Sequence, residues 1–263
     1  MKKIKTAVIL CGGNGSRLGA TGKKIPKTLI VIQKKPILWY ILSELILKHK
    51  FNHFILPIGH KGQMIKNYIS VEFTNKRNKD VSFDIIDTGI DTSISRRIFK
   101  IKNEINSKHF LLLNGDAIFN FKIGKIFNNH IKKNLDLTLL TCNVISPFGV
   151  VIKNKNIPIN FKRDMKYDNI HTSENNIFGE IFTGMSIIKT SLLKKINFKN
   201  YTNFETGFYP KILKLQKLYN NECKKIDGFW YAMDDLKQVE LANLIKNKNS
   251  ISKKINVIKK IYQ

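Results

Sequence analysis

The 263-residue sequence predicts an α/β protein with a doubly wound, Rossmann-like mixed sheet in a single domain. Short apolar runs alternate with amphipathic segments, as expected when helices cover both faces of a mainly parallel sheet. No internal repeat and no stretch rich in Pro, Gly or Ser interrupts this alternation. Three segments bearing glycine or aspartate, 12–17, 87–89 and 115–116, follow predicted strands. They therefore lie at the edge where such sheets bind their ligands.

The individual elements follow from the hydrophobic pattern in chain order. Short apolar runs predict strands, at residues 6–11, 54–58, 81–86, 109–113, 137–143 and 181–188. Apolar residues spaced by three or four predict helices, at residues 36–50, 63–70, 123–133, 192–196, 208–219 and from 236 to the end. Residues 148–161 have an irregular, hairpin-like pattern. We expect one domain over 1–245, with a regular half of about 1–145 and an irregular half of about 146–245, then a basic helix over 246–263.

Basic residues dominate the charge of the chain. Lysine and arginine total 46 against 19 acidic residues, which gives a net charge of +27. Only five of the 46 are arginines, the residues whose planar fork reads nucleic-acid bases, and the lysines are spread over the whole sequence. We therefore expect a solvated basic surface with no nucleic-acid partner. A basic nucleic-acid-binding protein is the alternative from another functional class.

Cysteine content and hydropathy indicate the cellular environment. Cys11, Cys142 and Cys223 are widely spaced and form no Cys-x-x-Cys pair, so they predict neither a disulfide framework nor a zinc site. All apolar runs are shorter than the roughly 20 residues that span a bilayer. The run after the basic N-terminus is also too short for a signal peptide. These features favour a cytoplasmic protein with no membrane partner; the oligomeric state stays open, and a homo-oligomer is permitted.

The first chemical feature is the glycine loop of residues 10–18, which follows the first predicted strand. Glycines let the backbone turn sharply and bring its N–H groups close to phosphate oxygens. The spacing fits neither a dinucleotide fingerprint nor a Walker A loop. On physical grounds alone, a tight connection between strand and helix is an equally good explanation. Arg17 and Lys27 add two cations that can reach an anion held by the loop.

Residues 12–18, followed by Pro26-Lys27, resemble the signature of the sugar-1-phosphate nucleotidyltransferases, also called nucleotide-sugar pyrophosphorylases. The resemblance extends from Thr6 to about Asn243 and includes segments 35–38, 114–116 and 228–234. It implies a fold of the nucleotide-diphospho-sugar transferase type, whose first half binds a nucleotide and whose second half binds the acceptor. Segments 87–92 and 230–234, together with Arg97, are closest to the glucose-1-phosphate cytidylyltransferase branch.

The resemblance also implies the reaction and its residues. A sugar 1-phosphate would attack a nucleoside triphosphate, with CTP as the first choice, in a Mg²⁺-dependent reaction that releases pyrophosphate. Asp116 and Asp234 match the metal ligands of the family, and Arg17 and Lys27 match its catalytic cations. The remaining implied residues are, for the nucleotide, Leu10, Cys11, Gly12, Gly13, Gly15, Thr88, Gly89, Arg97 and Gly115, and, for the acceptor, Lys162, Arg163, Gly184 and Glu205.

The acceptor region departs from the family pattern. Where a Glu-Lys-Pro motif is usual, residues 160–165 read Asn-Phe-Lys-Arg-Asp-Met. Either Lys162 or Arg163 could bind the acceptor phosphate, and no glutamate is left there for a sugar hydroxyl. Glucose 1-phosphate is the first expectation, and another hexose or heptose 1-phosphate, another phosphorylated acceptor or another nucleotide are the alternatives. A further alternative is a relative that keeps the fold but has lost catalysis.

Overall fold

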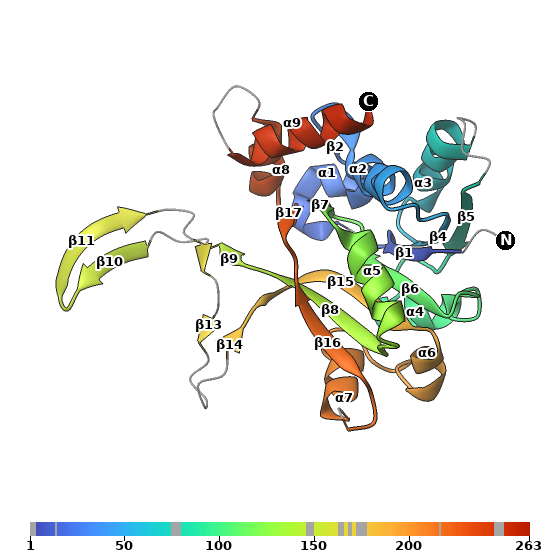
Figure 1. Ribbon diagram of the computed structural model, residues 1–263. Helices are drawn as coiled ribbons and strands as arrows, with labels where there is room; N and C mark the ends of the chain where they lie inside the picture. The colour runs from blue at the N-terminus through green and yellow to red at the C-terminus, as the bar shows by residue number, and fades with distance from the viewer. Residues whose placement is uncertain are drawn as a thin grey trace.

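The computed structural model describes residues 4–13, 15–74, 80–145, 150–162, 166–167, 170–171, 178–215, 217–244 and 250–263. At its centre lies a seven-stranded sheet in the order β16-β8-β15-β6-β1-β4-β5 (Figure 1). Within this sheet β15 runs antiparallel to both neighbours, and the other strands run parallel to one another. The predicted mixed α/β sheet is therefore confirmed. Its strands are β1 (Thr6–Leu10), β4 (His53–Ile58), β5 (Ser82–Asp87), β6 (His109–Asn114), β8 (Leu137–Cys142), β15 (Ile181–Lys189) and β16 (Asn221–Lys225).

Helices cover both faces of the sheet, because successive side chains of a strand point to opposite sides. In β1, Ala7 and Ile9 belong to one buried cluster, which includes residues of α2, α3, α5, α8 and α9. Val8 belongs to a second cluster with residues of α4, α6 and α7. The helices are α1 (Gly19–Lys24), α2 (Ile37–Ser43), α3 (Gly62–Ile69), α4 (Ile94–Ile101), α5 (Ile123–Lys132), α6 (Ser191–Lys195), α7 (Phe208–Lys214), α8 (Leu236–Asn243) and α9 (Ser250–Tyr262).

The helix predicted at 36–50 changes its winding half-way. The buried α2 continues as a π-helical segment, η3 (Glu44–Lys48), which leaves the Glu44 side chain fully buried. That carboxylate is bonded to Nε2 of His49 at 3.0 Å and accepts a hydrogen bond from the Tyr262 hydroxyl of α9. The stretch predicted as helical from 236 to the end is divided into α8 and α9. The hydrogen bond from Tyr262 holds α9 at the end of α2, which α9 also contacts. In the part of the chain that the structure describes, no helix could cross a membrane.

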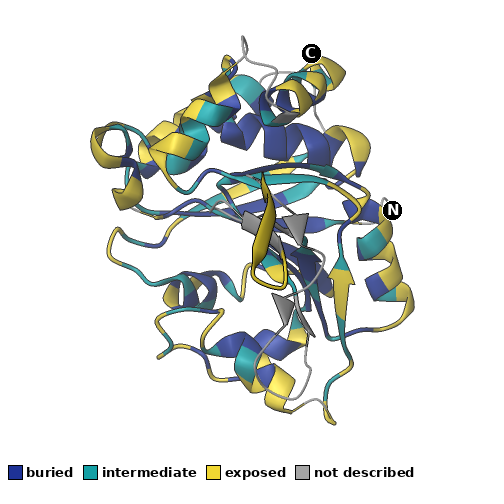
Figure 2. Cartoon of the chain, turned by 90° about the vertical axis from the view of Figure 1, so that its left-hand side faces the viewer, coloured by how far each residue is buried: buried dark blue, intermediate teal, exposed yellow. Residues whose placement is uncertain are grey.

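Small antiparallel ladders complete the fold. The hairpin predicted at 148–161 is present as β10 and β11 and extends away from the central sheet (Figure 1). Its second strand is coloured as exposed in Figure 2. The exposed residues of that strand include Ile157, Ile159 and Phe161. The ladders are β2 (Val31–Ile32) with β3 (Lys35–Pro36), β7 (Ala117–Phe121) with β17 (Gly228–Ala232), β9 (Val144–Ile145) with β12 (Lys166–Tyr167), β10 (Val150–Asn154) with β11 (Ile157–Lys162), and β13 (Ile170–His171) with β14 (Phe178–Gly179).

Candidate active site

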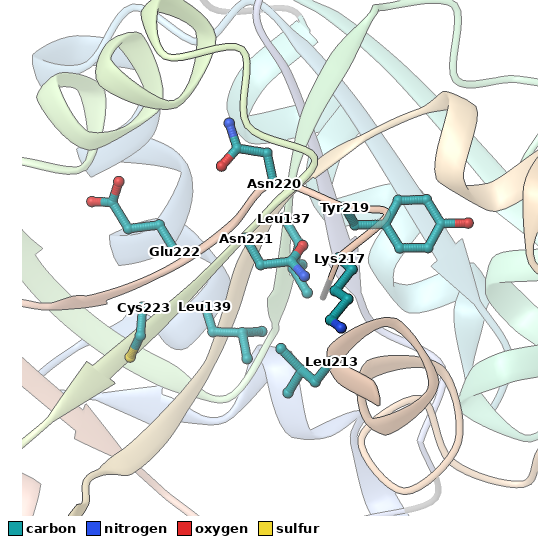
Figure 3. A pocket seen from close by; sticks show the side chains of 9 residues that line it. All are labelled: Leu137, Leu139, Leu213, Lys217, Tyr219, Asn220, Asn221, Glu222 and Cys223. Carbon is teal, nitrogen blue, oxygen red and sulfur yellow. The ribbon is translucent and has the colours of Figure 1, made fainter. Parts of the chain in front are cut away.

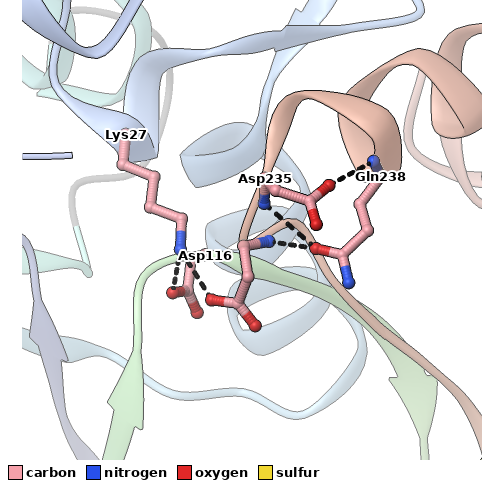
Figure 4. A network of polar contacts seen from close by, with 5 residues as sticks. Lys27, Asp116, Asp235 and Gln238 are labelled. Carbon is pink, nitrogen blue, oxygen red and sulfur yellow. Dashed lines mark hydrogen bonds and ion pairs between the residues drawn. The ribbon is translucent and has the colours of Figure 1, made fainter. Parts of the chain in front are cut away.

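Two carboxylates from distant parts of the sequence hold one ammonium group. Nζ of Lys27 donates to Oδ2 of Asp116 at 2.7 Å and to Oδ1 of Asp234 at 2.9 Å (Figure 4). The three side chains are 19%, 23% and 47% exposed, so solvent reaches the group. Burial alone would lower the pKa of Lys27, but the charges and hydrogen bonds of the two aspartates outweigh it and raise that pKa. The two carboxylates are therefore close enough to share a single cation.

The ladder between β7 and β17 brings the two aspartates together. Ala117 of β7 is paired with Ala232 of β17, and beyond this pair the Met233 N–H donates to the Asp116 carbonyl at 3.0 Å. Asp116 thus precedes one strand of the ladder and Asp234 follows the other. Gly115 lets this turn lie against β1, because a Cβ there would stand 2.8 Å from the Leu10 carbonyl. Lys27 reaches the aspartates from the short helix η2 (Lys27–Leu29), which follows an extended proline.

The neighbouring Asp235 has a structural role at the start of α8. Its carboxylate accepts a hydrogen bond from the Gln238 N–H at 2.8 Å and caps α8 (Figure 4). In return, Oε1 of Gln238 accepts from the N–H groups of Asp235 at 3.1 Å and of Asp234 at 2.5 Å. This reciprocal arrangement is a capping box, which satisfies backbone donors at a helix start. Of the two adjacent aspartates, Asp234 is the one that faces Asp116.

Arg97 holds the inner side of the glycine loop. Arg97 as a residue is 4% exposed. Its guanidinium donates to the carbonyls of Gly12 at 2.7 Å, Ile58 at 3.1 Å and Ile90 at 2.9 Å, and to the Thr88 hydroxyl at 2.6 Å. Burial lowers the pKa of this guanidinium despite the opposing charges of Asp87 and Asp91. A Cβ at Gly12 would lie 2.2 Å from a guanidinium nitrogen. Gly12 is therefore glycine because Arg97 occupies the space of a side chain.

The outer side of the same loop is open. Gly13 is exposed, and a Cβ there would meet nothing within 4 Å. Gly15 adopts a left-handed φ of 62°, which glycine accommodates without strain. Arg17 follows in the short helix η1 (Ser16–Leu18), with its side chain exposed. The loop thus offers backbone and one cation on its solvent side, where an anion can approach.

Leu10, Cys11, Thr88 and Gly89 line the strand ends beside this loop. Cys11 is buried, and burial raises the pKa of its thiol well above the ordinary value. The Thr88 hydroxyl donates to the Ile58 carbonyl at 2.7 Å, and Lys100 donates to the Thr88 carbonyl at 2.6 Å. Gly89 has a φ of 90°. The main chain is bonded within the protein as well, since the Thr88 N–H donates to the Ile58 carbonyl and the Gly89 N–H donates to the Asp87 carboxylate. These bonds hold the strand ends beside the loop in place.

The predicted acceptor residues are placed only in part. Gly184, at a φ of 72°, lies where the β15–β8 register shifts, and a Cβ there would stand 2.5 Å from the Asn114 amide nitrogen. Glu205 is exposed over much of its surface, yet partial burial and then the charge of Asp116 raise its pKa. The Glu205 carboxylate is therefore near enough to Asp116 to feel its charge. Lys162 ends β11 on the projecting hairpin, and Arg163 lies outside the described residues.

Gln238 and Lys100 contact this region although the sequence did not mark them. The spacing Asp-x-x-Gln before an apolar run is the capping-box signal, so Gln238 was available to sequence reasoning. For Lys100 there was no signal, because one lysine among many in this chain carries no information.

The aspartate pair suits Mg²⁺ by its donor chemistry. Mg²⁺ is commonly held by one or two carboxylates, while waters and substrate phosphates complete its octahedron. Asp116 and Asp234 supply two such carboxylates at a solvent-accessible place next to the open glycine loop. Within the described ranges no cluster of three or more His, Cys, Asp or Glu side chains forms a closed metal cage. The residues present therefore fit a metal shared with phosphate oxygens.

A separate pocket of about 510 Å³ lies against β8 and β16 (Figure 3). Its walls include Leu137 and Asn221, the first residues of those two strands, and Tyr219. It therefore lies beside the amino-terminal parts of these two strands, whereas the residues described above follow carboxyl ends. None of the predicted site residues lines this pocket.

A glycine loop at the carboxyl edge of parallel strands, beside two carboxylates that share a cation, defines a nucleotide-binding α/β protein of the phosphate-handling class. A family model described as nucleotidyl transferase matches residues 6–160. The chain belongs to the nucleotidyl transferase family, and its resemblance to the sugar-1-phosphate nucleotidyltransferases is confirmed.

Relatives with several substrates support this assignment. The chain is 28% identical over 258 residues to a Bacillus subtilis (strain 168) protein named "Probable glucose-1-phosphate cytidylyltransferase", covering 92% of this chain and 96% of the relative. It is 29% identical to the D-glycero-alpha-D-manno-heptose 1-phosphate guanylyltransferase of Aneurinibacillus thermoaerophilus, covering 81% and 87%. The UTP-bound UGPase structure from Acinetobacter baumannii superposes with a TM-score of 0.67 at 16% identity, covering 98% and 99%, which supports the fold.

Proposed function

We propose that the protein transfers a cytidylyl group from CTP to a sugar 1-phosphate, with glucose 1-phosphate as the first acceptor and Mg²⁺ as the cofactor. The observation that carries this proposal is the convergence of Asp116 and Asp234 on one cation beside the glycine loop. Mg²⁺ bound to these carboxylates would neutralise charge on the α-phosphate and orient it. The products are a CDP-sugar and pyrophosphate.

Residues of the chain provide the positioning. A phosphate oxygen of the acceptor attacks the α-phosphorus, and the bond to the leaving pyrophosphate breaks in line with it. Such transfers depend mainly on orientation and charge neutralisation. Gly13 and Arg17 offer an N–H group and a cation at the open side of the loop. Lys27, once it leaves the aspartates, would stabilise the departing pyrophosphate, while main-chain groups at Thr88 and Gly89 would face the base and ribose.

The choice of CTP rests on two supports. The first is the resemblance of segments 87–92 and 230–234 to the cytidylyltransferase branch. The second is the match to the Bacillus subtilis relative over nearly the full length of both chains. Arg97 fits this choice as the residue that fixes the strand-end carbonyls around which the nucleotide would lie.

GTP with a heptose 1-phosphate is the second candidate. Two relatives named D-glycero-alpha-D-manno-heptose 1-phosphate guanylyltransferase are 29% and 32% identical to this chain, over 81% and 59% of its length. The altered acceptor segment, with Lys162 and Arg163 in place of the usual Glu-Lys-Pro motif, also favours an acceptor other than glucose 1-phosphate. Gly184 and Glu205 are the described residues that we expect beside that sugar.

A pyrophosphate-release assay tests the proposal. Four nucleoside triphosphates are crossed with glucose, mannose and heptose 1-phosphates in the presence of Mg²⁺, and CTP with glucose 1-phosphate should give the fastest turnover. Faster turnover with GTP and a heptose 1-phosphate would select the second candidate. Binding of CTP without turnover by any pair would identify a catalytically inactive relative, and salt-resistant binding of duplex DNA or RNA would favour the nucleic-acid alternative.

Adjacent aspartates provide a matched pair of variants for the mechanism. Asp234→Asn should lower turnover by at least two orders of magnitude, because it removes a charged ligand next to the reacting phosphate. Asp235→Asn keeps a good helix cap and lies outside the ion pair, so it should retain most of the activity. Equal activity of the two variants would contradict the assignment of Asp234.

A further inference from the structure

The acidic pair is held unequally by its surroundings. Asp116 is 23% exposed, and the turn that carries it is fixed by the β7–β17 ladder and by the close packing of Gly115. Asp234 is 47% exposed and stands between the end of β17 and the first residue of the α8 cap. Packing therefore restrains Asp234 much less than Asp116, and its backbone needs another restraint if the carboxylate is to keep its direction.

The Gln238 side chain supplies that restraint. Its Oε1 accepts hydrogen bonds from two consecutive backbone N–H groups, those of Asp234 and Asp235. The Asp234 N–H belongs to the peptide group before the Cα of Asp234, and the Asp235 N–H belongs to the peptide group after it. Two bonds to one oxygen therefore restrain the backbone on both sides of the Cα that carries the carboxylate. The Gln238 carbonyl in turn accepts from the Tyr231 hydroxyl of β17 at 3.2 Å. The first turn of α8 is thus tied to both the strand and the residues that follow it.

An ordinary helix cap does not require this geometry. A capping box needs one bond from the Gln238 N–H to the Asp235 carboxylate and one from the Asp235 N–H to the Gln238 side chain, and both are present. The additional bond to the Asp234 N–H, at 2.5 Å, extends the box by one residue to the aspartate that contacts Lys27. The extension acts on the residue with the proposed ligand role.

We propose that Gln238 is a positioning residue, which aims the Asp234 carboxylate at the place where Asp116 and Asp234 share a cation. The inference rests on the proposed function, since it assigns the residue that orients one ligand of the proposed metal. Groups that orient metal ligands through hydrogen bonds typically change metal affinity by about 10- to 100-fold when removed. Gln238 contacts neither reactant; it acts through the main chain of Asp234.

Two substitutions at position 238 separate the effect of the accepting oxygen from the effect of side-chain size. Gln238→Met keeps the length of the side chain and its preference for helix but removes the accepting oxygen. Gln238→Glu keeps an accepting oxygen for both N–H groups. Binding of Mn²⁺ alone, measured from the loss of the free-ion EPR signal at high protein concentration, should weaken about tenfold or more in Gln238→Met. Gln238→Glu should stay within about threefold of the wild type.

Asp235→Ala is the matched control, because it breaks the other half of the capping box. It removes the acceptor of the Gln238 N–H and lowers the stability of the protein, yet it leaves the bond from the Asp234 N–H to Gln238 in place. Its Mn²⁺ affinity should stay within about threefold of the wild type. Weakening in Asp235→Ala as large as in Gln238→Met would show that only the stability of α8 matters, and would overturn the proposal.

Turnover gives a second readout. In Gln238→Met the Mg²⁺ concentration for half-maximal activity should rise about tenfold, and the KM for the sugar 1-phosphate should change less than threefold. Asp234→Asn is the reference variant, because it distinguishes a failure of the proposed metal site from a failure of the proposed role of Gln238. Unchanged Mn²⁺ binding in Asp234→Asn would refute the metal site itself. Loss of binding in Asp234→Asn with full binding in Gln238→Met would refute only the role of Gln238.

Discussion

Replacing Lys27 with methionine removes the cation that the two aspartates share while keeping a side chain of similar length. Lys27 makes two charge-assisted hydrogen bonds, at 2.7 and 2.9 Å. Such bonds contribute about 1.5–3 kcal/mol each when buried, and partial exposure of all three side chains reduces each to about 1 kcal/mol. A divalent ion that binds the carboxylates in the absence of nucleotide must therefore overcome about 2 kcal/mol of competition from Lys27.

The expected result is that Lys27→Met binds Mn²⁺ alone about 30-fold more tightly than the wild type, since each 1.4 kcal/mol is a factor of ten. Turnover should fall by at least two orders of magnitude in the same variant, because the cation that we propose to stabilise the leaving pyrophosphate is lost. Thermal stability without metal should also fall, and saturating Mn²⁺ should restore it. Lys23→Met, on an exposed lysine of α1, is the control and should change none of these quantities.

The opposite response of binding and turnover makes this prediction demanding. A lysine that merely adds positive charge to the nucleotide site would lower turnover when removed and would alter Mn²⁺ affinity only slightly. Unchanged or weaker Mn²⁺ binding in Lys27→Met would therefore refute competition between the ammonium and a divalent ion, even if turnover were lost.

Two further predictions concern buried polar groups. Arg97→Met should destabilise the protein by about 3 kcal/mol, because four hydrogen bonds of the buried guanidinium are lost; urea unfolding measures this, and the exposed Arg96→Met should cost under about 0.5 kcal/mol. Burial and the neighbouring His109 lower the pKa of His130 to about 3. Below about pH 6.5 the unfolded chain thus binds a proton that the folded chain does not, and stability should fall by about 1–2 kcal/mol between pH 7 and 5. A His130→Gln variant that keeps the full pH dependence would contradict this source.

The sequence located the acidic pair but could not show what lies between its members. Asp116 and Asp234 were marked by their motifs, and the structure brings them to one cation. The occupant is Lys27, which the resemblance assigned to the triphosphate. A motif records which residues meet a substrate at some stage of a reaction. It does not record which partners they have before the substrate arrives.

Arg97 shows a different limit of sequence reasoning. Its motif suggested a contact with the nucleotide, whereas its guanidinium is surrounded by carbonyls of the protein. The guanidinium fits there because positions 12 and 59 are glycines. A Cβ added at position 12 would lie 2.2 Å, and one added at position 59 would lie 2.6 Å, from a guanidinium nitrogen. Only the folded chain brings these two glycines and Arg97 together, so the sequence had no local signal for this packing.

Strand β17 is not among the strands that the sequence predicts, and the reason lies in its own residues. β17 has the sequence Gly-Phe-Trp-Tyr-Ala, without the apolar–polar alternation that predicts a strand with one buried face. The strand exists because β7 pairs with it over its whole length. That pairing joins residues more than 100 positions apart, and no window of neighbouring residues can contain it. The ladder that builds the site was therefore the part of the fold least accessible from the sequence.

The restraints on the three charged residues indicate which of them moves during a reaction cycle. Asp116 is held by the β7–β17 ladder, and Asp234 is held through the two N–H groups bound by Gln238. Among the described residues, only the two aspartates bond the ammonium of Lys27, which stands at the end of four rotatable bonds. If a triphosphate and Mg²⁺ bind as proposed, the aspartates can keep their places, and the ammonium is the group that can move toward the phosphates. A lysine in this position offsets one of the two aspartate charges before substrate arrives and would then be within reach of the leaving group, so a single side chain would serve both states of the site.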